Sequence, residues 1–395
     1  MQYIIILFFL ILNNFFGFFK VDNAILLCLL IPFLFKGFRK YSIYKNYFIL
    51  LFIGIILNFT SCFYFRGQNF FESFKAMPIF LYVLFYYVLK VLKPSLFTTE
   101  KVLLFLIISF DIIYILQFIL IQKNINIFHI EEWSIGEDSN STRLRMMSQG
   151  LFSLGIFFGI NKFSFTRKPI YLLCIFLGVV ITFLAAFRTF IVAVSFFIIF
   201  MLFKLKGGGK KIFLTLILGS IGMFGLIQIP MVSDKMDYVF SRFQSKDETL
   251  SNKDYIRLAQ FRYFTKERPK NTFEYILGSG MPYGDSKYSK NFEANRLNGM
   301  QYVDWGLLGL SWMLGILPVL AMILYSLKVI RLKVDKRYIY IGVWYLYLLS
   351  TSLFEIEFYR YGNFLVQAIA LYLVELAFLK REKRSTNNYK TITKL

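Results

Sequence analysis

Residues 251–284, SNKDYIRLAQFRYFTKERPKNTFEYILGSGMPYG, lie in the middle of the only long polar interval of the chain, which runs from about 230 to 302. Outside this interval the sequence consists mainly of apolar runs joined by short polar connections, and 57% of the 395 residues are hydrophobic. Long uncharged runs at this density exceed what soluble domains contain. The sequence therefore predicts an all-α, polytopic integral membrane protein with one large loop.

The apolar runs predict about twelve transmembrane helices in a single domain, 1–395, with the 230–302 loop between the ninth and tenth spans. The expected spans are 3–19, 24–36, 46–63, 76–92, 100–121, 146–161, 169–187, 189–203, 211–229, 303–326, 339–354 and 363–379. The second, sixth and eighth are shorter than the ~20 residues of a straight span. We expect these to be tilted, re-entrant or sheltered by neighbours.

The basic residues predict the orientation of the chain. More than half of the 45 Lys and Arg residues fall in six short segments on one side, at 36–45, 90–101, 162–168, 204–211, 328–337 and 380–395. The positive-inside rule then places both termini in the cytoplasm and the large loop outside. This distribution accounts for the net charge of +22 without a nucleic-acid partner. No P-loop motif occurs, which argues against an ATP-driven transporter.

Inside the large loop, a capping-box-like start and Pro269 as a stop predict a helix over 252–268. One face of this helix carries two arginines and two aromatic residues, at Arg257, Phe261, Phe264 and Arg268. Arg262 points away from that face. The turn at Gly278 and Gly280 lets backbone amides approach an anion closely. These features favour a phosphate-bearing ligand, and a basic amphipathic helix on anionic headgroups would look the same.

Arg188 interrupts the stretch VVITFLAAFRTFIVAVSFF, residues 179–197, with no polar loop around it. An Arg deep in the bilayer costs roughly 2.5–3.5 kcal/mol. Snorkelling is the simple explanation for such a residue at a membrane rim. Because the predicted orientation puts Arg188 on the outer side, we favour an anionic ligand there.

The turn E-I-E-F-Y-R between the last two spans supplies the first-ranked candidates for a general base, Glu355 and Glu357, and ends on Arg360. Asp304 is a further carboxylate on the outer side. His129 is the only histidine, so neither a Ser-His-Asp triad nor a His-based zinc site can form, and the three cysteines lack metal spacing. We expect no metal and no cofactor.

Four short motifs resemble the O-antigen and capsular polysaccharide polymerase/ligase superfamily, and Wzy-type polymerases most of all. They are F-R-T at 187–189, Y-I-R at 255–257, I-L-G-S-G at 276–280 and D-W-G-L-L-G at 304–309. Arg188 and Arg257 match the family's functional outer-loop arginines, and Gly278 and Gly280 match its G-x-G turn. Arg268 matches less well, because its spacing to the glycine turn is not in perfect register. Where the ligase branch carries a histidine, this chain has Asn295 to Asn298, which favours a polymerase.

The resemblance implies a glycosyltransferase of the bacterial cytoplasmic (inner) membrane with its active site on the extracytoplasmic face. It would polymerise polyprenyl-pyrophosphate-linked oligosaccharide repeat units, as donor and acceptor, into O-antigen or capsular polysaccharide. A chain-length regulator is a further expected partner. Arginines would bind the pyrophosphate and a carboxylate would deprotonate the acceptor hydroxyl. We expect catalytic roles for Arg188, Arg257, Glu355 and Glu357, and substrate contacts from Arg268, Gly278, Gly280, Asp304 and Arg360. A ligase that transfers finished glycan, and a transporter or flippase, are the alternatives.

Overall fold

The computed structural model describes residues 1–12, 28, 30–121, 123, 125, 127, 131–133, 143–185, 188–205, 256–353 and 355–392. The first half of the chain forms α1 (Gln2–Leu12), α3 (Ile31–Phe38), α4 (Lys45–Ser61), the π-helix η1 (Cys62–Arg66), α5 (Phe70–Ala76), α6 (Pro78–Leu81), the 3₁₀-helix η2 (Tyr82–Leu84), α7 (Phe85–Leu92), α8 (Leu96–Ile121), β1 (Glu131–Trp133), β2 (Arg143–Arg145), α9 (Gly150–Thr166), α10 (Ile170–Leu184) and α11 (Arg188–Lys204).

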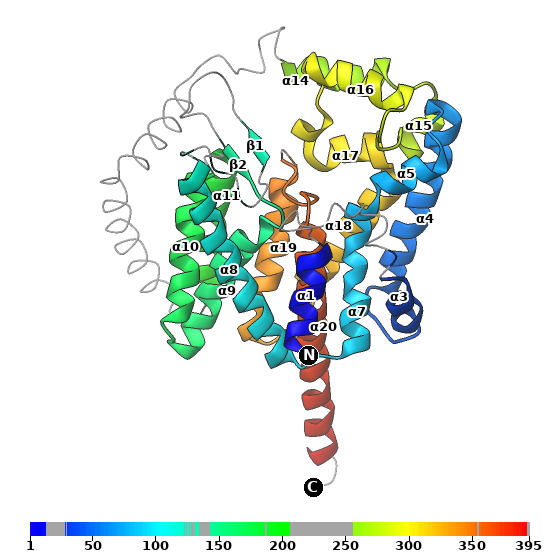
Figure 1. Ribbon diagram of the computed structural model, residues 1–395. Helices are drawn as coiled ribbons and strands as arrows, with labels where there is room; N and C mark the ends of the chain where they lie inside the picture. Colours follow the sequence, from blue (N-terminus) through cyan, green and yellow to red (C-terminus); the bar gives the residue numbers. More distant parts are fainter. Residues whose placement is uncertain are drawn as a thin grey trace.

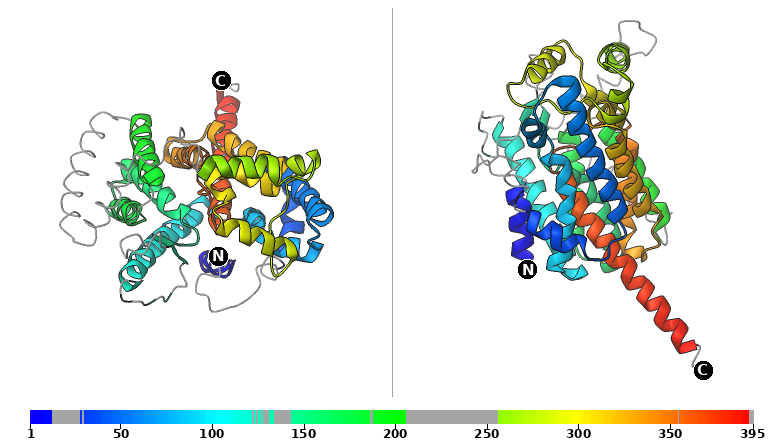
Figure 2. Two further views of the ribbon diagram at one scale, coloured as in Figure 1. Left: turned by 90° about the horizontal axis from the view of Figure 1, so that it is seen from above. Right: turned by 90° about the vertical axis from the view of Figure 1, so that its right-hand side faces the viewer.

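The second half forms α14 (Ile256–Arg262), the π-helix η4 (Tyr263–Glu267), α15 (Thr272–Leu277), α16 (Lys287–Leu297), the 3₁₀-helix η5 (Tyr302–Trp305), α17 (Gly306–Leu314), α18 (Ile316–Arg331), the 3₁₀-helix η6 (Lys336–Tyr338), α19 (Ile339–Thr351) and α20 (Asn363–Ile392). Figure 1 shows the long helices as a bundle, with α14, α15 and α16 together at its upper end. The N-terminus and the C-terminal end of α20 lie toward the opposite end, and Figure 2 shows α20 continuing past the bundle.

The described residues contain three helical segments that are long and apolar enough to cross a membrane: Lys45–Arg66, Leu96–Ile121 and Asn363–Lys383. The pair Phe70–Ala76 and Pro78–Leu92 bends by 56° and would make a fourth if it forms one span. The predicted number of twelve is therefore not confirmed. The predicted ninth span, 211–229, lies outside the described residues.

Aromatic and aliphatic side chains fill the interior of the bundle. α9 packs against α8, α10 and α19, while α4 packs against α18 and α7 packs against α20. Among the described residues the largest fully buried side chain is Trp344, and many tyrosines are fully buried as well. The outside is apolar as well: α8 exposes four large residues on one face, at Phe105, Ile112, Leu116 and Ile119. Such an outward apolar face is what a lipid-facing helix requires.

The prediction of an all-α chain is correct for the bundle but omits a short ribbon. β1 and β2 pair antiparallel, with Glu131 opposite Arg145 and Trp133 opposite Arg143. This ribbon lies within the polar connection that precedes α9. Its strands have three residues each, too few to show the alternating pattern that reveals a strand in sequence.

The predicted span 303–326 is broken in the structure. η5 and α17 precede Gly315, which has a φ of +96°, and α18 then continues to Arg331. Gly306 at the start of α17 also has a positive φ, of +51°. A left-handed backbone of this kind is inexpensive only for glycine. The chain therefore turns twice before it enters the bundle, and Figure 1 shows α17 at the level of α15.

Candidate functional site

A small pocket lies where the N-terminal ends of α9 and α11 meet the C-terminal end of α19 and the α19–α20 connection. It is lined by Gln149, Thr189, Phe190, Tyr347, Thr351, Glu355, Glu357 and Arg360. Three of the residues predicted from the sequence, Glu355, Glu357 and Arg360, therefore share one site. The free space is about 10 Å³, enough for about one water molecule, so in this conformation a hydroxyl or a phosphate oxygen fits but a whole sugar ring does not.

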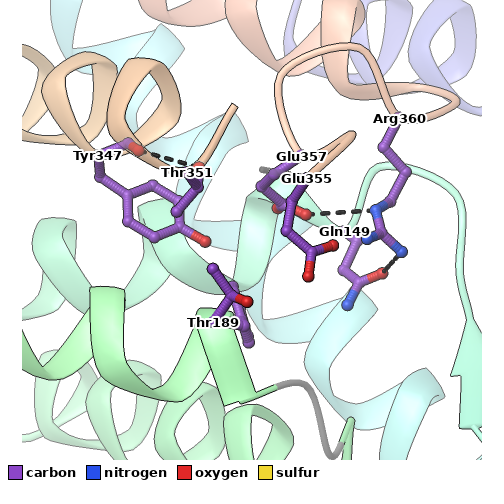
Figure 3. A pocket seen from close by; sticks show the side chains of 8 residues that line it. Gln149, Thr189, Tyr347, Thr351, Glu355, Glu357 and Arg360 are labelled. Atoms are coloured by element: carbon purple, nitrogen blue, oxygen red, sulfur yellow. Dashed lines mark hydrogen bonds and ion pairs between the residues drawn. The ribbon is translucent and has the colours of Figure 1, made fainter. Parts of the chain in front are cut away.

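Arg360 is held from two sides. Its Nη1 donates to Oε1 of Gln149 at 2.7 Å, and its Nε lies 3.2 Å from Oε2 of Glu357. Arg360 is 8% exposed, and Gln149 is buried. Figure 3 shows the guanidinium between the two partners. A guanidinium held in this way has a set orientation at the wall of the pocket, and its planar shape suits recognition of a phosphate.

Glu357 is buried beside Arg360 and has an unpartnered oxygen. Its side chain is buried, and among the described residues its Oε1 has no hydrogen-bond partner. Burial raises the pKa of this carboxyl above its ordinary value, while the charge of Arg360 opposes the shift and Glu355 adds to it. A buried carboxylate with a free oxygen can accept a proton or a hydrogen bond from a group that enters the pocket.

Glu355 and Tyr347 complete the polar lining. Glu355 is half-buried, and Figure 3 shows its carboxylate, the Tyr347 hydroxyl and the Thr189 side chain directed at the same space. Tyr347 is buried, and its hydroxyl has no hydrogen-bond partner among the described residues. Since Glu355 keeps access to solvent and faces the pocket, it fits the role of proton acceptor better than Glu357.

The α19–α20 connection is anchored to the start of α9. The N–H of Ser148 donates to the carbonyl of Tyr361 at 2.8 Å, and the N–H of Gly150 donates to Oδ1 of Asn363 at 2.8 Å. Asn363 in turn donates through Nδ2 to the Glu357 carbonyl at 2.6 Å. These bonds fix the backbone that carries Glu357 and Arg360, so the two side chains are positioned by helices far apart in sequence.

Arg188 lies next to this pocket without lining it. It is the first residue of α11 and immediately precedes Thr189, which does line the pocket. Arg188 is half-buried. The start of α11 thus reaches the pocket that holds Glu355 and Glu357, and the catalytic role expected for Arg188 stays a prediction.

The other predicted residues lie in a second group around α14, α15 and α17. Arg268 is buried and donates through Nε and Nη2 to Oγ of Ser279, at 3.2 and 3.0 Å. Its guanidinium also lies against three aromatic rings, those of Phe264, Tyr288 and Phe292. These contacts occupy Arg268 within a small aromatic core, so its expected substrate contact is not visible in the structure.

The glycine turn is occupied by backbone pairing. The N–H of Ser279 donates to the Trp312 carbonyl at 3.0 Å, and the N–H of Gly280 donates to the Met313 carbonyl at 2.9 Å. The N–H of Gly278 donates to the Glu274 carbonyl of α15. A Cβ on Gly278 would lie 2.4 Å from the Gly315 nitrogen. These amides are already hydrogen-bonded, so the expected contact with an anion is not seen in this structure: Gly278 packs closely against the end of α17, and Gly280 against Cys62 of η1.

The helix around Arg257 also differs from the predicted pattern. α14 passes into the π-helix η4, in which the N–H of Arg268 donates to the Tyr263 carbonyl. The extra residue per turn moves the buried face to Gln260, Phe264 and Arg268, whereas Phe261 is 41% exposed. Three residues of the predicted face, Phe261, Phe264 and Arg268, still lie together, because both phenylalanine rings contact Trp312 and the Arg268 guanidinium lies over the Phe264 ring. Arg257 is half-buried, and residues 252–255 of the predicted helix lie outside the described residues.

The segment that begins at Asp304 joins the second group to the α19–α20 connection, which carries the pocket. Its Oδ2 accepts from Nε2 of the buried Gln260 at 2.9 Å. From the same region Leu307 N–H donates to the Ser352 carbonyl at 2.8 Å, and the Tyr359 hydroxyl donates to the Gly306 carbonyl at 3.2 Å. The start of α17 thus packs on the α19–α20 connection. Any movement of α14 to α17 relative to the bundle has to break these bonds.

Among the described residues no group of three His, Cys, Asp or Glu side chains could hold a metal ion. Comparisons of the chain with protein-family models, with curated proteins and with solved structures gave no match. The functional assignment therefore depends on the chemistry of the site itself and on the sequence motifs.

Proposed function

We propose that this protein is a membrane glycosyltransferase that polymerises polyprenyl-pyrophosphate-linked oligosaccharide repeat units into a bacterial surface polysaccharide. The observation that supports the proposal is the pocket in which Glu355, Glu357 and Arg360 meet Gln149 and Thr189. It combines a positioned guanidinium with a solvent-accessible carboxylate at one end of a helix bundle. The sequence motifs that resemble Wzy-type polymerases point the same way.

Each group has a defined task in this reaction. The guanidinium of Arg360 binds the pyrophosphate of the donor and stabilises the negative charge that develops as the glycosidic C–O bond breaks. Arg188, one residue from the pocket, adds a second positive charge at the same level. Glu355 accepts the proton of the acceptor hydroxyl as that oxygen attacks the anomeric carbon. The reaction proposed for these groups proceeds without a metal ion.

The location in a membrane follows from the same proposal. We place the long apolar helices and the outward apolar face of α8 in the lipid, with twelve spans as the sequence predicts. The end that carries α14 to α16 is the extracytoplasmic end in the inner membrane, because the short basic connections belong in the cytoplasm. Donor pyrophosphates then lie at the depth of the pocket. At that face no nucleotide sugar is required, since the lipid carrier supplies the activation.

The reaction is tested with purified full-length protein and one substrate, the lipid-linked repeat unit. A polymerase uses this substrate as donor and acceptor, so we expect a ladder of glycan lengths on a gel. Glu355→Gln should lower the rate about 100-fold or more, because general-base catalysis contributes ~10²–10⁴-fold. The matched control is Glu293→Gln, which removes an exposed carboxylate from α16 and should keep most of the activity.

Other outcomes would overturn the proposal in different ways. A ladder that appears only when a separate lipid or protein acceptor is added identifies a ligase. No ladder, together with movement of the lipid-linked unit across vesicles, identifies a transporter. Equal losses in Glu355→Gln and Glu293→Gln would show that the pocket does not carry the chemistry.

A further inference from the structure

A second, much larger cavity lies at the end of the bundle opposite α14, α15 and α16. Its volume is about 730 Å³. The walls come from the C-terminal ends of α9 and α11, from the connection between α18 and α19, and from α20 (Figure 1). Cavities of roughly 300–1,000 Å³ are typical of sites for small-molecule ligands. The proposed reaction makes no use of this cavity.

Positive charge dominates the lining of this cavity. Of the described residues, four basic side chains line it, Lys336, Arg337, Lys380 and Arg381, against one carboxylate, that of Asp335. Oδ1 of Asp335 accepts the N–H of Arg337 at 3.0 Å and caps η6. Among the described residues, no carboxylate lies within ion-pair distance of the four basic groups. Among the residues that the structure describes, the cavity therefore carries more positive than negative charge, and the positive charge comes from two separate segments of the chain.

Most of the remaining wall of the cavity is apolar, and Ser164 and Tyr338 add two hydroxyl groups to it. Phe165 is 43% exposed, and Leu205, Val334 and Ala377 complete this wall. A soluble anion needs only the basic groups and gains nothing from an exposed phenylalanine. A molecule with a phosphate at one end and hydrocarbon at the other satisfies both parts of the lining.

We propose that this cavity binds the headgroup of an anionic phospholipid, with the phosphate between the basic side chains and the first acyl carbons against Phe165 and Leu205. The inference rests on the membrane location given above and is independent of the polymerisation reaction. In the predicted orientation the cavity opens at the cytoplasmic leaflet, where basic pockets between helices meet anionic headgroups. Each basic residue near such a surface contributes about 1 kcal/mol, or about fivefold in affinity.

The test measures lipid binding to the purified full-length protein in detergent by native mass spectrometry. Phosphatidylglycerol is compared with phosphatidylethanolamine of the same acyl chains and with inorganic phosphate. We expect phosphatidylglycerol to be retained in preference to both. The double variant Lys336→Gln, Arg337→Gln should weaken its binding about 30-fold, and Lys380→Gln with Arg381→Gln should weaken it similarly from the opposite wall.

The matched control is Lys36→Gln with Arg39→Gln. It also removes one Lys and one Arg from exposed positions in a segment assigned to the same side, in and after α3, and should leave binding unchanged. Equal weakening in control and cavity variants would overturn the proposal in favour of general attraction. Binding of inorganic phosphate as tight as that of the lipid would assign the cavity to a soluble anion instead. Glu355→Gln should leave lipid binding intact, so failure of this inference and failure of the proposed reaction are distinguishable.

Discussion

The buried pair of Glu357 and Arg360 shows how one turn of the chain sets the chemistry of the pocket. Two charges taken out of water stabilise the fold only when their remaining atoms are hydrogen-bonded. Arg360 is hydrogen-bonded to Gln149, whereas Oε1 of Glu357 has no hydrogen-bond partner in the part of the chain that the structure describes. An incompletely satisfied carboxylate at a buried position reduces the stability of the free protein. It leaves an acceptor ready for a ligand group.

This arrangement predicts a pH-dependent stability that depends on Glu357. Because burial raises its folded-state pKa above the ordinary value, the folded protein binds this proton more tightly than the unfolded chain. Glu357 therefore stabilises the folded protein fully at pH values below its pKa in the unfolded chain, and this stabilisation is lost as the pH rises through its pKa in the folded protein. We expect the melting temperature of the purified protein to fall as the pH rises from the ordinary pKa of a glutamate to the raised pKa of Glu357 in the folded protein. In Glu357→Gln the fall in melting temperature that is due to this carboxyl should be absent. If the melting temperature of the variant depends on pH as in the unchanged protein, the dependence does not come from Glu357.

At the residue scale, the carboxylates were the predictable part of the site. Glu355, Glu357 and Arg360 occur within one short turn between apolar runs, where few residues need to be charged. Gln149 and Tyr347 carried no comparable signal, because neutral polar residues beside apolar runs are common and their partners come from packing. The role of the glycine turn could not be decided from the sequence, since amides that serve packing and amides that bind anions have the same sequence pattern.

At the scale of elements, backbone hydrogen bonds join α15 to α17, and the helix pair α14–η4 packs on α17 through aromatic rings. The turn after α15 pairs with the end of α17, and Phe264 stacks on Trp312 with ring centroids 5.2 Å apart. The end of the helix near Pro269 could be predicted from the breaker residue, whereas the predicted capping residues, Ser251 and Asp254, lie outside the described residues. The π-helix could not, because it arises from tertiary contacts that hold Phe264 and Arg268 inward.

The close approach of α15 to α17 predicts a large effect for Gly278→Ala. A new Cβ would lie 2.4 Å from the Gly315 nitrogen, and the backbone φ of +79° adds strain. Left-handed backbone costs about 1–2 kcal/mol for a residue with a Cβ, and overpacking adds about 1–3 kcal/mol. The control is Gly284→Ala, at a φ of +62° with no atom within 4 Å of its Cβ. Denaturation of the purified proteins should show the larger loss for Gly278→Ala, and equal losses would refute the packing role.

At the scale of the whole molecule, the two ends of the bundle differ in chemistry. One end carries α14 to α17 and the pocket of carboxylates and Arg360, and the other carries the large basic cavity. The positions of most helices could be predicted, because apolar runs must bury their backbone polar groups in helices. Their number as spans could not be fixed, since several are short or broken, and a span broken at Gly315 has the same hydropathy as a straight one.

The asymmetry between the ends predicts the topology of the chain in the membrane. The proposals require the basic cavity at the cytoplasmic leaflet and the carboxylate pocket at the extracytoplasmic face. Leu205, at the end of α11, must then be cytoplasmic, and the loop at Gly284 must lie outside. Alkaline phosphatase fused after Gly284 should be active, because the enzyme folds only outside the cytoplasm. Fused after Leu205, it should be inactive, whereas green fluorescent protein at that position should fluoresce. The reverse pattern would put the pocket where no lipid-linked repeat is polymerised and the cavity at the less anionic leaflet, and both proposals would then fail together.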